Sequence, residues 1–81
     1  MKLRFTDRAD KDYAGLSVIV RKAFAKQLEH LLSNPRHPSL RSKKFEGQDD
    51  LWQARVDRSW RFYFKIVNDE YVIVAIIAHP K

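Results

Sequence analysis

The stretch HPSLRSKKFEGQDDLWQARVDRSWRFYF, residues 37–64, alternates large apolar side chains with arginine and lysine. Successive side chains of a β-strand point to opposite faces of the sheet. The alternation therefore predicts two adjoining strands that share an apolar face: Trp52, Ala54, Val56, Trp60, Phe62 and Phe64. The other face takes Gln53, Arg55, Arg61, Tyr63 and Lys65. A free sheet face that gathers arginines suits a phosphate-rich partner.

On the N-terminal side of this stretch, the sequence predicts one short strand and two helices. Residues 2–5 alternate as a strand, and Thr6 or Asp7 can cap a short helix that runs to about Tyr13. Ser17 can cap a longer helix, which Asn34-Pro35 then ends. Helical spacing gives this second helix one apolar stripe: Val20, Phe24, Leu28, Leu31 and Leu32.

After the second helix, the sequence predicts a loop followed by four strands. The strands are expected over residues 42–46, 51–57, 60–67 and 71–78, with Phe45 directed into the core. Residues 47–50 are predicted to form a turn, and Asn68-Asp69 a hairpin. The last strand is apolar on both faces, which indicates either a central strand or one that is covered on both sides. The predicted fold is α+β, in the order β-α-α-β-β-β-β, with two N-terminal helices packed on one face of an antiparallel sheet.

Size and composition narrow the possible functions. The 81 residues suffice for one domain, and the net charge of +6 favours nucleic acid or an acidic protein as partner. There is no cysteine, which excludes disulfides and thiolate metal sites, and neither a metal site nor another cofactor is expected. No apolar run approaches the roughly 20 residues of a membrane span, and the N-terminus has no signal-peptide pattern. We therefore expect a cytoplasmic protein without a membrane partner.

A further pattern extends through nearly the whole chain: His37-Pro38-Ser39-Leu40-Arg41, Lys43-Lys44-Phe45, Gly47, Leu51-Trp52, Arg55-Val56, Trp60-Arg61, Tyr63-Phe64 and His79. This pattern and the order of elements resemble the RelE/ParE superfamily of type II toxins, which a co-expressed antitoxin neutralises. The resemblance implies a single toxin domain over residues 1–81. It does not separate the branches of the superfamily. RelE-like and YafQ-like members cleave mRNA in the ribosomal A site, whereas ParE-like members poison DNA gyrase.

The resemblance implies four catalytic residues. Arg61 falls where related nucleases place an arginine that contacts the scissile phosphate. Arg55 falls where RelE has a functional lysine and YafQ a histidine, and Lys43 lies near a catalytic histidine of YafQ. His79 matches the histidine near the C-terminus of the YafQ branch. Gln53 falls where RelE has another functional lysine.

The chemistry of RNA cleavage agrees with these roles. Attack by the 2′-hydroxyl requires a proton acceptor, stabilisation of the anionic phosphate and a proton donor for the leaving 5′-oxygen. His79 can serve as acid or base near neutral pH, and Arg61 and Arg55 can donate paired hydrogen bonds to phosphate. A lysine among other cations, such as Lys43, can also transfer a proton. Predicted RNA-binding residues are Lys44, Arg41, Gln53, Arg58 and Tyr63, whose ring can stack on a base.

Three functions remain open at this point. The first is a ribosome-dependent, metal-independent mRNA endoribonuclease that inhibits translation, with mRNA on the ribosome as its substrate. The second is a gyrase poison that acts by binding a protein. The third is a degenerate toxin that binds antitoxin or RNA without turnover, because Lys81 ends the sequence without the terminal aromatic residue and late arginine of many nuclease members. In each case we expect an antitoxin whose acidic segment wraps the toxin, and oligomers that form through the antitoxin.

Overall fold

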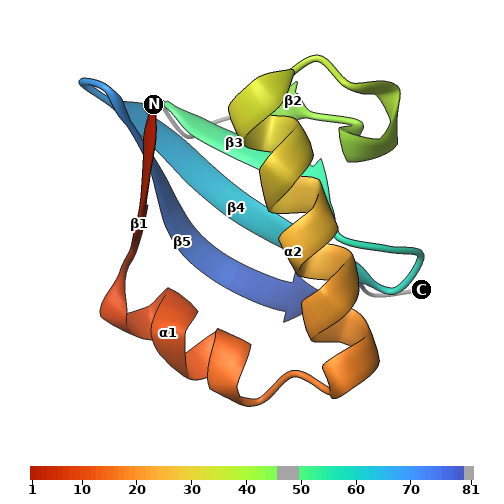
Figure 1. Ribbon diagram of the computed structural model, residues 1–81. Coiled ribbons are helices and arrows are strands. Elements are labelled where there is room, and N and C mark those ends of the chain that lie inside the picture. Colours follow the sequence, from red (N-terminus) through yellow and green to blue (C-terminus); the bar gives the residue numbers. More distant parts are fainter. Residues whose placement is uncertain (46–49, 80–81) are drawn as a thin grey trace.

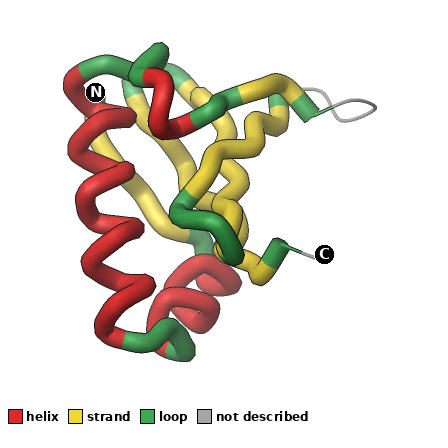
Figure 2. The backbone as a smooth tube through the Cα atoms, turned by 90° about the vertical axis from the view of Figure 1, so that its right-hand side faces the viewer, coloured by secondary structure: helices red, strands yellow, loops and turns green. Residues whose placement is uncertain are grey.

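The computed structural model describes residues 1–45 and 50–79. The elements follow the predicted order: β1 (Lys2–Phe5), α1 (Asp7–Ala14), α2 (Val18–Ser33), the 3₁₀ turn η1 (Pro38–Leu40), β2 (Lys43–Lys44), β3 (Leu51–Arg55), β4 (Trp60–Val67) and β5 (Glu70–Ala78). The five strands form one sheet in the order β1-β5-β4-β3-β2. Helix α2 crosses one face of this sheet, and α1 lies near the end of β5 (Figure 1). The view in Figure 2 shows α2 and the strands as two separate layers.

The sheet is mixed, and this differs from the antiparallel sheet predicted. Strand β1 pairs parallel to β5, with Lys2 opposite Glu70 and Phe5 opposite Ile73, while the other pairs are antiparallel. Strand β5 therefore lies inside the sheet, between β1 and β4, as its apolar sequence predicts. The two strands of a parallel pair cannot be joined by a tight hairpin and need a long connection. Here the whole chain between β1 and β5 provides that connection.

The helix boundaries follow the predicted capping residues. The Thr6 hydroxyl accepts a hydrogen bond from Ala9 N–H, and the Ser17 hydroxyl accepts one from Val20 N–H. Helix α2 ends at Ser33, immediately before Asn34-Pro35. The predicted apolar stripe is buried or half-buried except at Leu32, which is 43% exposed because it lies one position beyond the buried Leu31 on the helix surface.

The core lies between α2 and the apolar face of the strands. The ring centroids of Phe24 on α2 and Phe62 on β4 are 5.2 Å apart in an edge-to-face arrangement. The largest fully buried side chains are Phe24, Phe62, Leu31, Leu40, Ile73 and Ile76. The predicted apolar face of β3 and β4 therefore packs against the helices, which leaves their basic face turned away from α2. No helix in residues 1–45 and 50–79 is long and apolar enough to cross a membrane.

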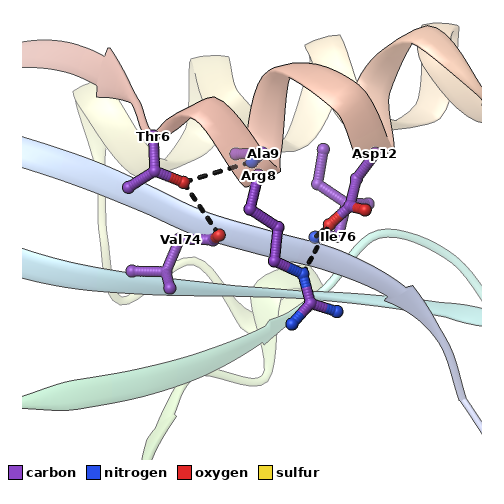
Figure 3. Close-up of polar contacts among 6 residues, drawn as sticks. All are labelled: Thr6, Arg8, Ala9, Asp12, Val74 and Ile76. Atoms are coloured by element: carbon purple, nitrogen blue, oxygen red, sulfur yellow. Dashed lines mark hydrogen bonds and ion pairs between the residues drawn. The ribbon is translucent and has the colours of Figure 1, made fainter.

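Two side chains complete the edge of β5 where β1 ends (Figure 3). The Thr6 hydroxyl donates to Val74 O over 3.0 Å. The Asp12 carboxylate accepts from Ile76 N–H over 2.9 Å and also pairs with Arg8. These contacts from α1 replace hydrogen bonds that a neighbouring strand would make, so they protect an otherwise open sheet edge.

The strands differ from the predicted bounds at three places, one of which is the start of β5 at Glu70 in place of residue 71. Strand β2 covers Lys43–Lys44 only, and β3 ends at Arg55 where the prediction continued to residue 57. Residues 46–49, which hold most of the predicted turn, lie outside the described residues. The predicted hairpin is present between β4 and β5, with Asn68 at a φ of 54°. Asparagine tolerates this left-handed conformation, which tight hairpins need.

Candidate nucleic-acid interface

Three of the predicted basic residues, Lys43, Arg55 and Arg61, lie in two rows across the face of the sheet opposite α2, here called the basic face. One row runs across three strands and contains Arg55, Arg61 and Ile77, because Arg55 pairs with Arg61 and Arg61 with Ile77. The next row, two residues along, contains Lys43, Gln53, Tyr63 and Ala75. The strand pairing thus confirms the assignment of residues 51–65 to the two faces of the sheet, which was predicted from their alternation in sequence.

Arg55 and Arg61 lie side by side and share one hydrogen-bond acceptor. Arg55 Nε donates to the backbone oxygen of Asp57 over 3.2 Å, and Arg61 Nη1 donates to the same oxygen over 2.9 Å. Arg61 Nη1 also contacts Trp60 O at 3.0 Å. Within residues 1–45 and 50–79, the ion pairs are Arg4–Glu70 and Arg8–Asp12, so no carboxylate of the described chain neutralises this pair. Two adjacent guanidinium groups with spare N–H donors have the chemistry to coordinate one oxyanion together.

The β3–β4 turn places the acceptor that the two arginines share. The Asp57 carboxylate accepts hydrogen bonds from Ser59 N–H at 2.8 Å and Trp60 N–H at 2.9 Å. These two bonds to Asp57 Oδ1 fix the turn, and the turn presents the backbone oxygen of Asp57 to both guanidinium groups. The sequence prediction missed this role of Asp57. The sequence does carry a signal for this turn: an aspartate two residues before a serine, a spacing typical of turns that a side chain stabilises.

His79 lies at the same end of the sheet as the arginine pair. Its backbone N–H donates to Ser59 O, which extends the pairing of β4 and β5 by one residue. Alternation from Ile77 places the exposed His79 on the basic face, about 7 Å farther along the strand. Arg58 is exposed in the β3–β4 turn at this end as well. The structure therefore gathers four of the predicted site residues, Arg55, Arg58, Arg61 and His79.

The prediction that Phe45 points into the core is wrong. Phe45 N–H donates to Leu51 O, which continues the register in which Lys43 pairs with Gln53 and Lys44 with Trp52. This register directs Lys43 and Phe45 to the basic face and Lys44 to the opposite side. The Phe45 ring meets the Tyr63 ring at a centroid distance of 5.7 Å and an angle of 87°. The sequence prediction assumed that the apolar side chain of this short strand marked the buried side.

An apolar groove of about 380 Å³ lies on the other side of the sheet. Its lining residues are Pro35, Arg36, His37, Pro38, Arg41, Ser42, Trp52, Phe64, Ile66 and Tyr71. The Ser42 hydroxyl is buried and has no hydrogen-bond partner among residues 1–45 and 50–79. Arg41, predicted to bind RNA, belongs to this groove and not to the basic face.

A buried glutamine connects the helix layer to the end of β3. The Gln27 side-chain amide donates to Ser39 O at 3.0 Å and to Arg55 O at 2.8 Å, and its oxygen accepts from the Ser39 hydroxyl at 3.0 Å. His37 contacts the same hydroxyl and stacks on His30 at 3.7 Å between ring centroids. This network holds the backbone of Arg55 in place. The sequence prediction did not include Gln27, because a polar residue beside an apolar stripe is usually exposed.

Comparisons with known proteins agree with this architecture. The family described as the ParE toxin of the type II toxin–antitoxin system parDE matches residues 3–80. A RelE-like toxin protein of Escherichia coli is 28% identical over 81 residues, which are 99% of this chain and 81% of that protein.

Two solved structures are similar in fold. The YoeB/ParE toxin from Agrobacterium tumefaciens has a TM-score of 0.84 at 15% identity, with 99% of this chain and all of that chain covered. The intact E. coli RelBE toxin–antitoxin complex contains a chain with a TM-score of 0.78 at 22% identity, with 99% and 98% covered.

Proposed function

The chain belongs to the ParE toxin family of type II toxin–antitoxin systems, within the RelE/ParE superfamily, and we propose that it arrests growth by cleaving mRNA on the ribosome. The observation that carries the proposal is the arginine pair on the basic face. Arg55 and Arg61 converge on one backbone oxygen, and neither has an acidic partner among the described residues. An RNA phosphate can supply the missing negative charge and accept their free N–H groups.

In the proposed reaction, a ribose 2′-oxygen attacks the adjacent phosphorus while the bond to the leaving 5′-oxygen breaks. Arg61 and Arg55 stabilise the charge that grows on the phosphate oxygens. His79 lies at the same end of the basic face, accepts the proton of the attacking 2′-hydroxyl and donates it to the leaving 5′-oxygen. Lys43 lies in the neighbouring row, two strands from Arg61, where it contacts the RNA backbone. Its position favours binding over proton transfer.

The test of this function compares variants expressed without antitoxin. Arg61→Ala and His79→Ala should each relieve growth arrest and lower mRNA cleavage, by about 100- to 1,000-fold for the loss of one charge-stabilising donor. Folding and antitoxin binding should be unchanged, as measured by circular dichroism and co-purification. Arg8→Ala removes an exposed arginine on α1 and should leave toxicity intact. Undiminished toxicity of both site variants would contradict the proposal.

A gyrase poison is the second candidate function, because the matching family carries the ParE description. In that case the fold acts by binding a protein, and cells should show DNA damage and an SOS response before translation stops. Measuring the protein-synthesis rate, RNA cleavage and SOS induction after expression separates the two candidates. A chain that binds RNA or antitoxin but produces none of these effects is a degenerate toxin.

We also propose a cognate antitoxin as partner. Several similar structures are described as complexes of RelE with RelB. The apolar groove offers this chain a place for such contact, because Trp52 and the exposed Ile66 line it and Arg36 and Arg41 supply positive charge. An antitoxin segment that combines apolar side chains with acidic neighbours matches both properties.

A further inference from the structure

Phe45 is an aromatic side chain on a basic surface. It is 38% exposed, and the register of β2 and β3 places it on the same face as Lys43, Gln53 and Arg55. An isolated exposed apolar side chain has no special meaning, since such residues are common on protein surfaces. Phe45, however, is not isolated, because its ring packs edge-to-face against Tyr63.

The geometry of this pair leaves aromatic surface available. In an edge-to-face contact the edge of one ring covers one face of the other ring, so the remaining faces are not used by the pair. The centroid distance of 5.7 Å and the angle of 87° describe this arrangement for Phe45 and Tyr63. The pair bridges over β3, because Phe45 follows β2 and Tyr63 belongs to β4.

A small hollow lies next to Phe45. Its volume is about 280 Å³, and its lining residues are Lys43, Lys44, Phe45 and Gln53. This is near the lower end of the range for small-molecule pockets, roughly 300 to 1,000 Å³, and suits one flat ring. The Gln53 amide offers both a donor and an acceptor to the edge of such a ring, and Lys43 offers a positive charge.

The arginine pair is close enough to act on the same ligand. Tyr63 and Arg61 are two residues apart on one face of β4, which separates them by about 7 Å along the strand. A nucleotide whose phosphate contacts Arg61 can therefore direct a neighbouring base toward the aromatic pair. Single-stranded RNA is recognised in this way, by backbone contacts together with stacking of unpaired bases on aromatic rings.

We infer that Phe45 and Tyr63, with Gln53 at the edge, form a stacking site for one unpaired RNA base, and that Phe45 is its main positioning residue. This inference rests on the proposed function and adds a base site to it. It assigns a role to Phe45, a residue that the alternation of apolar and polar positions alone directs to the core. Phe45 touches no reacting atom, so its effect is on how the RNA is bound and placed.

The test measures binding of two probes by fluorescence anisotropy at low salt. One probe is a short single-stranded oligoribonucleotide, and the other has the same backbone with abasic positions. Phe45→Leu keeps the apolar character but removes the aromatic face, and should bind the base-bearing probe about 5- to 150-fold more weakly. Its affinity for the abasic probe should equal that of the wild type. Phe45→Trp keeps an aromatic face and, unlike Phe45→Leu, should still bind the base-bearing probe more tightly than the abasic probe.

Control variants distinguish the base site from the phosphate site. Arg61→Ala should weaken binding of both probes, because it removes a phosphate contact. Ile19→Ala, which changes a 78% exposed side chain on α2, should change neither. Equal binding of the base-bearing probe by the wild type and Phe45→Leu would overturn the base site alone. Failure of the wild type to bind either probe would overturn the RNA interface and the base site together.

Discussion

At the scale of single residues, Gln27 shows how one buried polar side chain supports the basic face from behind. Its amide satisfies the backbone oxygens of Ser39 and Arg55, and it is only 7% exposed. Both bonds are partly buried, and a carbonyl that loses its donor in such a place costs more than an average hydrogen bond contributes. Gln27 therefore links the stability of the helix layer to the position of Arg55.

Replacing Gln27 with an apolar residue of similar length tests this link. Gln27→Met should lower the free energy of unfolding by about 1–3 kcal/mol for each carbonyl left unpaired. Lys26→Met changes the exposed neighbour and should stay within about 0.5 kcal/mol. Urea denaturation of the three proteins measures both effects. Equal stability of Gln27→Met and Lys26→Met would show that the hydrogen bonds of Gln27 contribute nothing to the free energy of unfolding.

At the scale of elements, the open part of the β5 edge depends on α1. The Asp12 carboxylate is 23% exposed and accepts the Ile76 N–H, so it provides a charge-assisted hydrogen bond within a partly buried site. Arg8, by contrast, is 63% exposed, and its ion pair with Asp12 is screened by solvent. The two contacts of Asp12 thus differ in energy, although both involve its carboxylate.

Three variants separate these contacts. Asp12→Ala should destabilise the protein by about 1.5–3 kcal/mol, because Ile76 N–H loses a charged acceptor. Asp12→Asn keeps an acceptor oxygen and should be less destabilising, and Arg8→Ala should cost less than about 1 kcal/mol. Amide hydrogen exchange at Ile76 gives an independent measurement. Full protection of this amide in Asp12→Ala would contradict the assignment.

At the scale of the whole molecule, the sheet separates two surfaces. The basic face carries Arg55 and Arg61, whereas the apolar groove opens on the helix side. If a toxin acts through one surface and binds its antitoxin through the other, a substitution can remove its toxicity without affecting neutralisation, or remove neutralisation without affecting toxicity. This separation is a consequence of strand alternation, which directs neighbouring residues of β4 to opposite sides.

A charge in the groove tests the separation. Ile66 lines the groove and is 46% exposed, so Ile66→Glu should fold but repel an acidic antitoxin segment. We expect retained toxicity with at least about tenfold weaker neutralisation by the antitoxin, taken as the product of the neighbouring open reading frame. Ile19→Glu places the same charge on α2 and should be neutralised normally. Normal neutralisation of Ile66→Glu would place the antitoxin elsewhere.

The sequence by itself determined the local features of this protein. Period-two alternation marked the two faces of β3 and β4, and the capping residues Thr6 and Ser17 marked the starts of the helices. These features depend on neighbours in the chain, so they are visible in a short window of sequence. The same alternation selected Arg55 and Arg61 as the centre of the candidate site.

Only the tertiary structure decided the features that depend on distant pairing. The parallel alignment of β1 with β5, the register that turns Phe45 outward and the contact of Gln27 with Arg55 each join segments far apart in sequence. A shift of one residue in register exchanges the two faces of a strand, and a two-residue strand such as β2 carries too little pattern to prevent it. The packing of the whole chain selects one register, and this choice gives the basic face its aromatic pair.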